Sequence, residues 1–156
     1  MLDYETWLEM RRLTPQDQEI MQSGSLKTIR HAEANAAHLR QWLAERVSLH
    51  VIDNFDDAHK VAAELVGCKR LALDIETAKI DPEHPQSGLN PKLSRIRLIQ
   101  YCNGTDCYLF DQFKIDSLDW INPLLDIETV AHNALFEASH FLHQGIIFNN
   151  LHDTML

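Results

Sequence analysis

The sequence predicts an α/β domain, a mixed β-sheet flanked by helices, that follows an α-helical N-terminal region. Two observations support this fold class. From residue 49 onward, short apolar or alternating segments typical of strands are interspersed with amphipathic segments typical of helices, in the order β-α-β-β-β-α-β-α. In the middle of this order, Asn103-Gly104 is a hairpin turn signal, which requires an antiparallel strand pair. A sheet that combines such a hairpin with helical connections is mixed and has helices packed on it.

Residues 1–47 are expected to form a helical extension. Thr14-Pro15 supplies an N-cap and a proline at the first helical position, and residues 23–25 (Ser-Gly-Ser) interrupt the helix. Residues 26–47 carry apolar side chains at helical spacing. The region contains no recognisable motif, and it is either a small docking domain or a stabilising arm. The apolar positions are Leu26, Ile29, Ala32, Ala36, Leu39, Leu43 and Val47.

Residues 49–156 carry the elements of the predicted domain. Asp53-Asn54 supplies a cap for a helix that ends on Gly67. A loop rich in Pro, Ser and Gly covers residues 81–88. The expected strands are 49–52, 69–75, 94–102, 107–111, 129–131 and a short one at 146–148, and the expected helices are 56–67, a weak Pro-interrupted segment at 116–125, and 133–143.

The composition restricts the class of protein. The chain is 45% hydrophobic but has no apolar segment long enough to span a bilayer, and its acidic N-terminus is not a secretory signal. A net charge of −9 excludes a nonspecific basic coat for nucleic acid, although it allows a nuclease whose site is neutralised by metal ions. Lys92, Arg95 and Arg97 form the one local basic cluster, which is either a phosphate contact or a solvated strand edge.

The cysteines and histidines do not form a metal-binding pattern. Three cysteines without a repeated spacing argue against a disulfide framework and favour a reducing, cytoplasmic location. Cys102 and Cys107 flank the hairpin turn and are expected to face each other as ordinary strand cysteines, because no second Cys/His pair at zinc-ligand spacing accompanies them. The nine histidines are scattered, which disfavours a His/Cys metalloprotein.

Two carboxylates in the predicted strand at 69–75 and the residues after it suggest a metal site. Asp74 and Glu76 are two residues apart, so in a strand they point to the same face at a spacing of roughly 6.5–7 Å. Two like charges so placed repel each other, and a bound divalent cation removes this cost. The alternative is a strand that runs into a solvated acidic turn.

A third carboxylate, Glu137, lies on the predicted helix at 133–143. Asn133 is a good N-cap for this helix, and Asn133, Glu137 and His140 follow the border of its apolar stripe. An unpaired carboxylate at the edge of a core is costly, and a metal ion shared with Asp74 would offset that cost. By itself, Glu137 is better explained as a surface residue of an amphipathic helix. The apolar stripe is expected to consist of Ala134, Ala138, Phe141 and Leu142.

Together these motifs resemble the DEDD family of 3′–5′ exonucleases, which have a ribonuclease H-like fold. The resemblance runs from about residue 49 to residue 156 and is greatest to the proofreading domains of polymerase I type. Each motif is weak alone, but their order and intervals are fairly specific. The motifs are Val51-Ile52-Asp53, Asp74-Ile75-Glu76-Thr77, the hairpin of 96–100 and 108–111, His132-Asn133-Ala134-Leu135-Phe136-Glu137, and Asp153-Thr154-Met155-Leu156.

The resemblance implies a site with two divalent cations, Mg²⁺ or Mn²⁺, held by acidic groups against the scissile phosphate. It implies that Asp74 bridges both ions, that Glu76 binds the ion on the nucleophile side, and that Glu137 takes a place where the family usually has Asp. Thr77 would face the 3′-terminal nucleotide. Asn133 and Phe136 would shape the second motif. Asp153 is expected to be structural, as a helix cap.

The chain departs from the family pattern in its third motif. The family has a Tyr or His four residues before a fourth Asp, and no such pair follows Glu137. Losing a positioned general base costs roughly 10²–10⁴-fold in rate. We therefore expect a C-terminally truncated domain: a fragment of a longer polymerase-linked exonuclease, half of a split enzyme completed by a partner chain, or an inactive relative.

The resulting functional prediction is a metal-dependent 3′–5′ exonuclease that acts on single-stranded DNA ends, or on RNA, which the motifs do not distinguish. Asp74, Glu76 and Glu137 are the predicted catalytic metal ligands, and Thr77, Asn133 and Phe136 the predicted substrate-binding residues. The expected partners are nucleic acid and a polymerase region or a completing chain, with no membrane. The alternative is a catalytically inactive module of the same fold that binds nucleic acid or protein.

Overall fold

The computed structural model describes residues 41, 44–81, 83–85 and 87–155. The chain divides into two units, Met1–Ser48 and Leu49–Leu156, and the second unit is the α/β domain. Almost all of the predicted helical extension, 1–47, lies outside the described residues. Within the described part of the chain, no helix is both long and apolar enough to cross a membrane.

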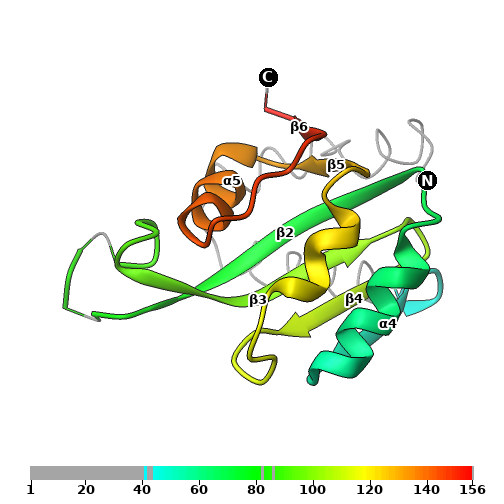
Figure 1. Ribbon diagram of the computed structural model, residues 1–156, viewed down its shortest axis with the longest axis horizontal. Helices are drawn as coiled ribbons and strands as arrows, with labels where there is room; N and C mark the ends of the chain where they lie inside the picture. The colour runs from blue at the N-terminus through cyan, green and yellow to red at the C-terminus, as the bar shows by residue number, and fades with distance from the viewer. Residues whose placement is uncertain (1–40, 42–43, 82, 86, 156) are drawn as a thin grey trace, which may run out of the picture. The chain divides into compact units, whose positions relative to one another are not determined.

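The domain is built on a six-stranded mixed sheet with the order β1-β4-β3-β2-β5-β6 (Figure 1). β2 pairs with β3, and β3 with β4, in antiparallel fashion, whereas β2–β5 and β5–β6 are parallel. This architecture confirms the predicted α/β class with a central hairpin. The strands are β1 Ser48–Ile52, β2 Arg70–Lys79, β3 Ser94–Cys102, β4 Asp106–Asp111, β5 Glu128–Ala131 and β6 Leu151–Asp153.

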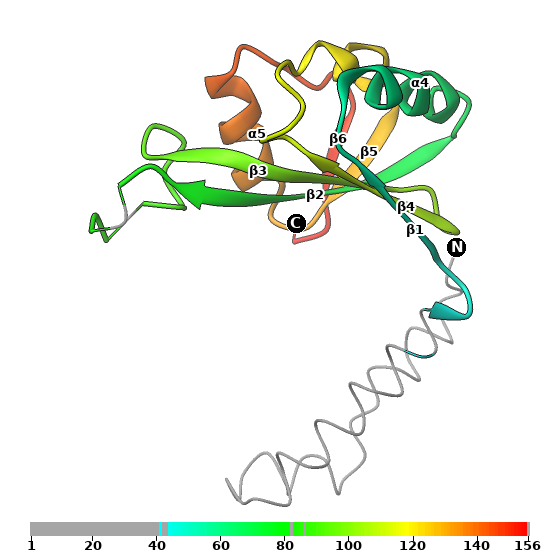
Figure 2. The same ribbon diagram turned by 90° about the horizontal axis from the view of Figure 1, so that it is seen from below.

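Three helical elements flank the sheet: α4 (Phe55–Leu65), the 3₁₀ helix η1 (Asp119–Leu124) and α5 (Ala134–His143). α4 and η1 lie on one face of the sheet (Figure 2). The cap predicted for the first helix is confirmed, since the Asn54 side chain accepts a hydrogen bond from the backbone N–H of Asp57. Pro123 explains why the segment predicted as a weak α-helix at 116–125 is instead a short 3₁₀ helix.

The core lies between the sheet and the helices. Leu71, Leu73 and Ile75 of β2 are buried, whereas the residues between them are exposed, as the alternation of a strand requires. The largest buried side chains form an aromatic cluster in which Phe110 stacks on Trp120 with ring centroids 4.0 Å apart. The Tyr101 ring meets both of these rings edge-on.

Two strand predictions were wrong. Residues 146–148 are not a strand, and the sixth strand is instead Leu151–Asp153, which adds to β5 in parallel. Its three residues give no alternation signal, so only pairing with β5 defines it as a strand. The strand predicted at 69–75 extends to Lys79, past both carboxylates, which therefore lie within the strand rather than at its end.

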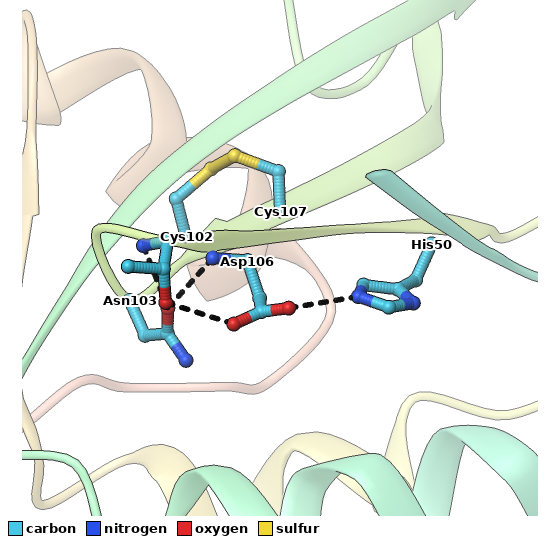
Figure 3. Close-up of polar contacts among 6 residues, drawn as sticks. His50, Cys102, Asn103, Asp106 and Cys107 are labelled. Carbon is cyan, nitrogen blue, oxygen red and sulfur yellow. Dashed lines mark hydrogen bonds and ion pairs between the residues drawn. A yellow bond between two sulfur atoms is a disulfide. The ribbon is translucent and has the colours of Figure 1, made fainter. Parts of the chain in front are cut away.

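The hairpin turn between β3 and β4 is held by side chains and by a disulfide (Figure 3). Cys102 and Cys107 face each other across the ladder, as predicted, but they are joined by a disulfide, so their prediction as ordinary strand cysteines was wrong. Their Cα atoms are 4.3 Å apart, and strand pairs at such spacing place the side chains close together. On the neighbouring β1, the His50 ring approaches the Asp106 carboxylate at 3.0 Å, and this hydrogen bond lowers the pKa of Asp106.

Candidate active site

β2 presents Asp74 and Glu76 on its exposed face. Both side chains are exposed, and they alternate with the buried Leu73 and Ile75. Their projection from the same face of one strand, expected from their spacing, is what the structure shows. The Gln100 side-chain amide, directly opposite on β3, donates a hydrogen bond of 3.2 Å to Asp74 Oδ2 and so orients this carboxylate.

α5 carries Glu137 on its buried face. Only 2% of Glu137 is exposed, and Ala134, His140 and Phe141 are buried with it. The predicted stripe was wrong at Leu142, which is 60% exposed, and Glu137 is not at the border of the buried face but within it. A tertiary contact holds α5 with Glu137 on its buried side, because His140 Nε2 lies 3.0 Å from the Ser94 hydroxyl of β3.

The surroundings of the Glu137 carboxyl group disfavour its ionised form. Its Oε2 atom is buried and has no hydrogen-bond partner among the described residues. Burial raises the pKa of Glu137, and although a backbone hydrogen bond lowers it, the charges of Asp74 and Asp153 raise it further. The charge of Asp74 on β2 is thus one of those that act on the Glu137 carboxyl group of α5.

The start of α5 is fixed by Asp153 of β6. The Asp153 carboxylate accepts hydrogen bonds from the backbone N–H groups of Asn133 and Ala134, each at 3.0 Å, and from that of Met155 at 2.9 Å. The predicted cap role of Asp153 is therefore confirmed. Asn133 occupies the N-cap position, but its backbone is left-handed (φ 63°) and its side chain makes no capping bond, so Asn133 does not act as the side-chain cap that was predicted.

The predicted substrate-binding residues lie in different surroundings. Thr77 is half-buried, and its hydroxyl donates a 2.6 Å hydrogen bond to the carbonyl of Gly88 in the β2–β3 loop. Phe136 is half-buried and its ring lies 4.4 Å from that of His140, whereas Asn133 is exposed. Contact of these three residues with a nucleotide stays a prediction.

The donor set fits a hard divalent cation in its chemistry, although the structure does not assemble a complete ligand shell. Within the described ranges, no three His, Cys, Asp or Glu side chains are arranged to hold a metal ion. Asp74, Glu76 and Glu137 nevertheless offer only carboxylate oxygens, the ligands such ions prefer. The buried, unpartnered Oε2 of Glu137 is an atom that a cation would satisfy. The assignment of these three residues as ligands therefore stays a prediction.

The site also includes residues that the sequence did not reveal. Gln100 became visible only through the β2–β3 register, which places it opposite Asp74. His132, whose Nδ1 lies 2.8 Å from the Thr154 hydroxyl, lowers the pKa of Glu137 through its charge. The Asn103-Gly104 turn sets only the β3–β4 register, whereas the β2–β3 register depends on the long loop between these two strands, which the sequence does not specify.

The fold is of the ribonuclease H-like class, and comparison with protein families identifies the family. The model of a 3′-5′ exonuclease family matches residues 49–156. The chain belongs to this family of 3′-5′ exonucleases, which depend on divalent metal ions. Curated protein sequences give no match.

Several solved structures have a similar fold. Escherichia coli RNase D, an exoribonuclease involved in structured RNA processing, superposes with a TM-score of 0.57 at 19% identity, covering 69% of this chain and 28% of that one. The catalytic core of RRP6 from Trypanosoma brucei gives 0.58 at 20% identity, covering 69% and 29%. The Aedes aegypti Nibbler EXO domain gives 0.51 at 18% identity, covering 67% and 47%. The chain thus spans less than half of the length of each.

Proposed function

We propose that this chain carries the metal-binding part of a 3′–5′ exonuclease that removes nucleotides from the 3′ end of single-stranded DNA, of the polymerase I proofreading type. The observation that carries the proposal is Glu137. This residue is buried, its Oε2 atom has no hydrogen-bond partner among the described residues, and its pKa is raised by burial and in part by Asp74, in a chain of the 3′-5′ exonuclease family. A carboxylate kept in such surroundings is explained by a cation that it shares with the exposed pair on β2.

In this proposal Asp74, Glu76 and Glu137 hold two divalent cations, Mg²⁺ or Mn²⁺. When bound, such ions polarise the phosphate and lower the pKa of a coordinated water. The chain itself contributes the positions of its oxygens: Gln100 orients Asp74, and Asp153 fixes the start of α5 and with it Glu137. Thr77, Asn133 and Phe136 are proposed to contact the terminal nucleotide.

RNA is the second candidate substrate. The structural neighbours include Trypanosoma brucei RNase D in complex with RNA U12, at 22% identity and a TM-score of 0.55. A likeness at this level concerns the fold, but it gives a reason to test RNA beside DNA. The 2′-hydroxyl is the group through which a site distinguishes the two polymers.

The test is a shortening assay on 5′-labelled single-stranded DNA and RNA of the same base order, with Mg²⁺ or Mn²⁺. We expect successive shortening from the 3′ end that Asp74→Ala abolishes. Asp56→Ala, which removes an exposed carboxylate from the first turn of α4, is the matched control and retains activity. If Asp74→Ala and Asp56→Ala both shortened the oligonucleotide at the parent rate, this result would contradict the assignment of the site. A folded chain that binds oligonucleotides without shortening them would support the inactive binding module instead.

A further inference from the structure

The segment that connects β4 to η1 holds an exposed phenylalanine against two arginines of β3. Phe113 is 51% exposed. The guanidinium carbon of Arg97 lies 4.7 Å from the centroid of its ring, and that of Arg95 lies 5.7 Å away. Both distances are within the range of cation–π attraction, so one ring holds two like charges close together.

Arg97 reaches this ring because β3 contains a bulge. In the β2–β3 ladder Glu76 pairs with Leu98 and Thr77 pairs with Ile96, so Arg97 has no partner on β2. Such an extra residue bends the strand and re-aims a side chain, a device that occurs often beside active sites. The bulge therefore lies directly next to Glu76 and removes Arg97 from the regular alternation of the sheet.

Asp111 fixes the position of Arg97. The two side chains form an ion pair, and Asp111 Oδ1 also accepts a hydrogen bond of 3.1 Å from the backbone N–H of Phe113. Burial opposes ionisation, but the hydrogen bond from Arg97 holds the pKa of Asp111 below its ordinary value. Gln112 stabilises the same turn by donating to the carbonyls of Ile115 and Ser117. Phe113 is thus presented on a fixed turn.

Arg95 has no ion pair with any described residue. Its side chain is exposed, and its contact with Phe113 is the interaction that the structure gives it. Asp111 thus forms an ion pair with Arg97 but none with Arg95, although both guanidinium groups lie over the same aromatic ring. The guanidinium groups favour an anion directly beside them, although the chain as a whole has a net charge of −9.

A cleft of about 710 Å³ adjoins the side chains of Arg95 and Phe113. Arg95 and Phe113 belong to its lining, the apolar contribution includes Ile115 and Ile146, and Asn122 and Gln144 supply amide groups. The volume is within the range of ligand-binding clefts, and the lining combines apolar with polar and charged side chains. An aromatic nucleobase fits such a lining, since its faces are apolar and its edges form hydrogen bonds.

Two carboxylates also line the cleft, those of Asp116 and Asp119. They would repel a phosphate placed beside them, so a phosphate is favoured only near the arginines. Carboxylates accept hydrogen bonds from the exocyclic amino groups of bases. The charges of the lining therefore divide it into a place for a phosphate and a place for a base.

We propose that Arg95, Arg97 and Phe113, together with the adjoining cleft, bind nucleotides upstream of the 3′ end of a single-stranded nucleic acid. A phosphate lies at the guanidinium groups and a base lies in the cleft. This inference deepens the proposed function and rests on it. Arg95 pairs with Ala78, which follows Glu76 by two residues on β2, roughly 6.5–7 Å along the strand. One strand of nucleic acid can therefore reach both the carboxylate pair and this site.

The experiment measures binding without hydrolysis. The affinity of the full chain for a fluorescent single-stranded dinucleotide and decanucleotide is determined by anisotropy in EDTA at several salt concentrations, for the parent and for Arg95→Ala and Phe113→Ala. We expect Phe113→Ala to weaken decanucleotide binding by about 5- to 150-fold, the effect of one lost stacking contact. Arg95→Ala should reduce the slope of log K against log salt by about 0.7, the effect of one lost phosphate contact on a single strand.

The control variant is Arg70→Gln, which also removes one arginine from the ladder but at the opposite end of β2, where Arg70 pairs with Glu128. It should bind both oligonucleotides as the parent does. Arg95→Lys, which keeps the charge, should retain the parent's salt slope. Because Arg95 and Phe113 are exposed, their variants are expected to fold, and circular dichroism checks this.

The inference is overturned if Arg95→Ala and Phe113→Ala bind the decanucleotide as Arg70→Gln does, or if the parent does not bind it at all. It stands if both variants lose affinity, whether or not the parent hydrolyses DNA or RNA with metal ions. A parent that shortens DNA in an Asp74-dependent manner, with Arg95 and Phe113 variants indistinguishable from the control, would leave the proposed function intact and remove this site.

Discussion

Glu137 has unusual surroundings for an acidic residue. Its side chain is buried in the face of α5 that packs on the sheet, yet one of its oxygens has no hydrogen-bond partner among the described residues. An apolar residue of similar size would stabilise the fold better at this position. This cost of burial is the reason for proposing Glu137 as a cation ligand.

The pH dependence of stability should reflect Glu137. Because its pKa is raised in the folded chain, the folded state binds this proton more tightly than the unfolded state does. The contribution of Glu137 to the free energy of unfolding is therefore most favourable below its unfolded value of 4.5 and decreases as the pH rises toward the folded pKa.

Glu137→Gln removes this titration. In EDTA, we expect the difference in Tm between Glu137→Gln and the parent to increase in favour of the variant from about pH 4.5 upward. Thermal unfolding followed by circular dichroism across that range measures the difference. Parallel Tm curves for parent and variant would show that the Glu137 carboxyl is not destabilised by burial.

At the scale of elements, the position of α5 depends on β6. The helix begins with a left-handed residue, Asn133, and its first N–H groups are satisfied by Asp153, twenty residues later in the chain. Side-chain acceptors at a helix N-terminus are also favoured by the helix dipole. Asp153 therefore connects the last strand to the element that carries Glu137.

Asp153→Ala should lower the free energy of unfolding by about 1–2 kcal/mol, the usual effect of removing a helix cap. Urea unfolding measures the change, and Asp116→Ala, which removes an exposed carboxylate with no hydrogen bond to a described residue, is the control. Equal stabilities of the two variants would mean that Asp153 does not hold α5. Asp153→Ala should also weaken metal binding. Asp153 holds the N–H groups of Asn133 and Ala134 at the start of α5, and Glu137 follows them on the same helix.

At the scale of the whole molecule, the three predicted ligands come from two elements that meet only in the folded domain. Asp74 and Glu76 belong to β2 and Glu137 to α5. A cation held by both elements binds the folded chain and not the unfolded one, so it stabilises the fold by mass action.

Mg²⁺ or Mn²⁺ should therefore raise the Tm of the parent chain. At a hundredfold excess over Kd the gain in the free energy of unfolding is about 2.7 kcal/mol. Differential scanning fluorimetry with increasing metal concentration measures the shift, and Asp74→Ala should show none. A Tm of the parent that is indifferent to both ions, or a shift retained in Asp74→Ala, would contradict the proposed ligand set.

The sequence by itself determined the features that depend on neighbouring residues. Alternation along β2 was sufficient to place Asp74 and Glu76 on one exposed face, Asn54 was sufficient to begin α4, and Asn103-Gly104 was sufficient to bring Cys102 opposite Cys107. Each of these features arises from backbone geometry within a few residues, which the local sequence specifies.

Only the tertiary structure decided the features that depend on distant contacts. The rotation that buries Glu137, the cap that Asp153 gives to α5, and the bulge that brings Arg97 to Phe113 each require a partner from another element. A helix of mixed composition fits the sheet in more than one rotation, and a strand of three residues exists only beside its neighbour. Packing and long-range hydrogen bonds select among these arrangements, and the local sequence carries no signal for them.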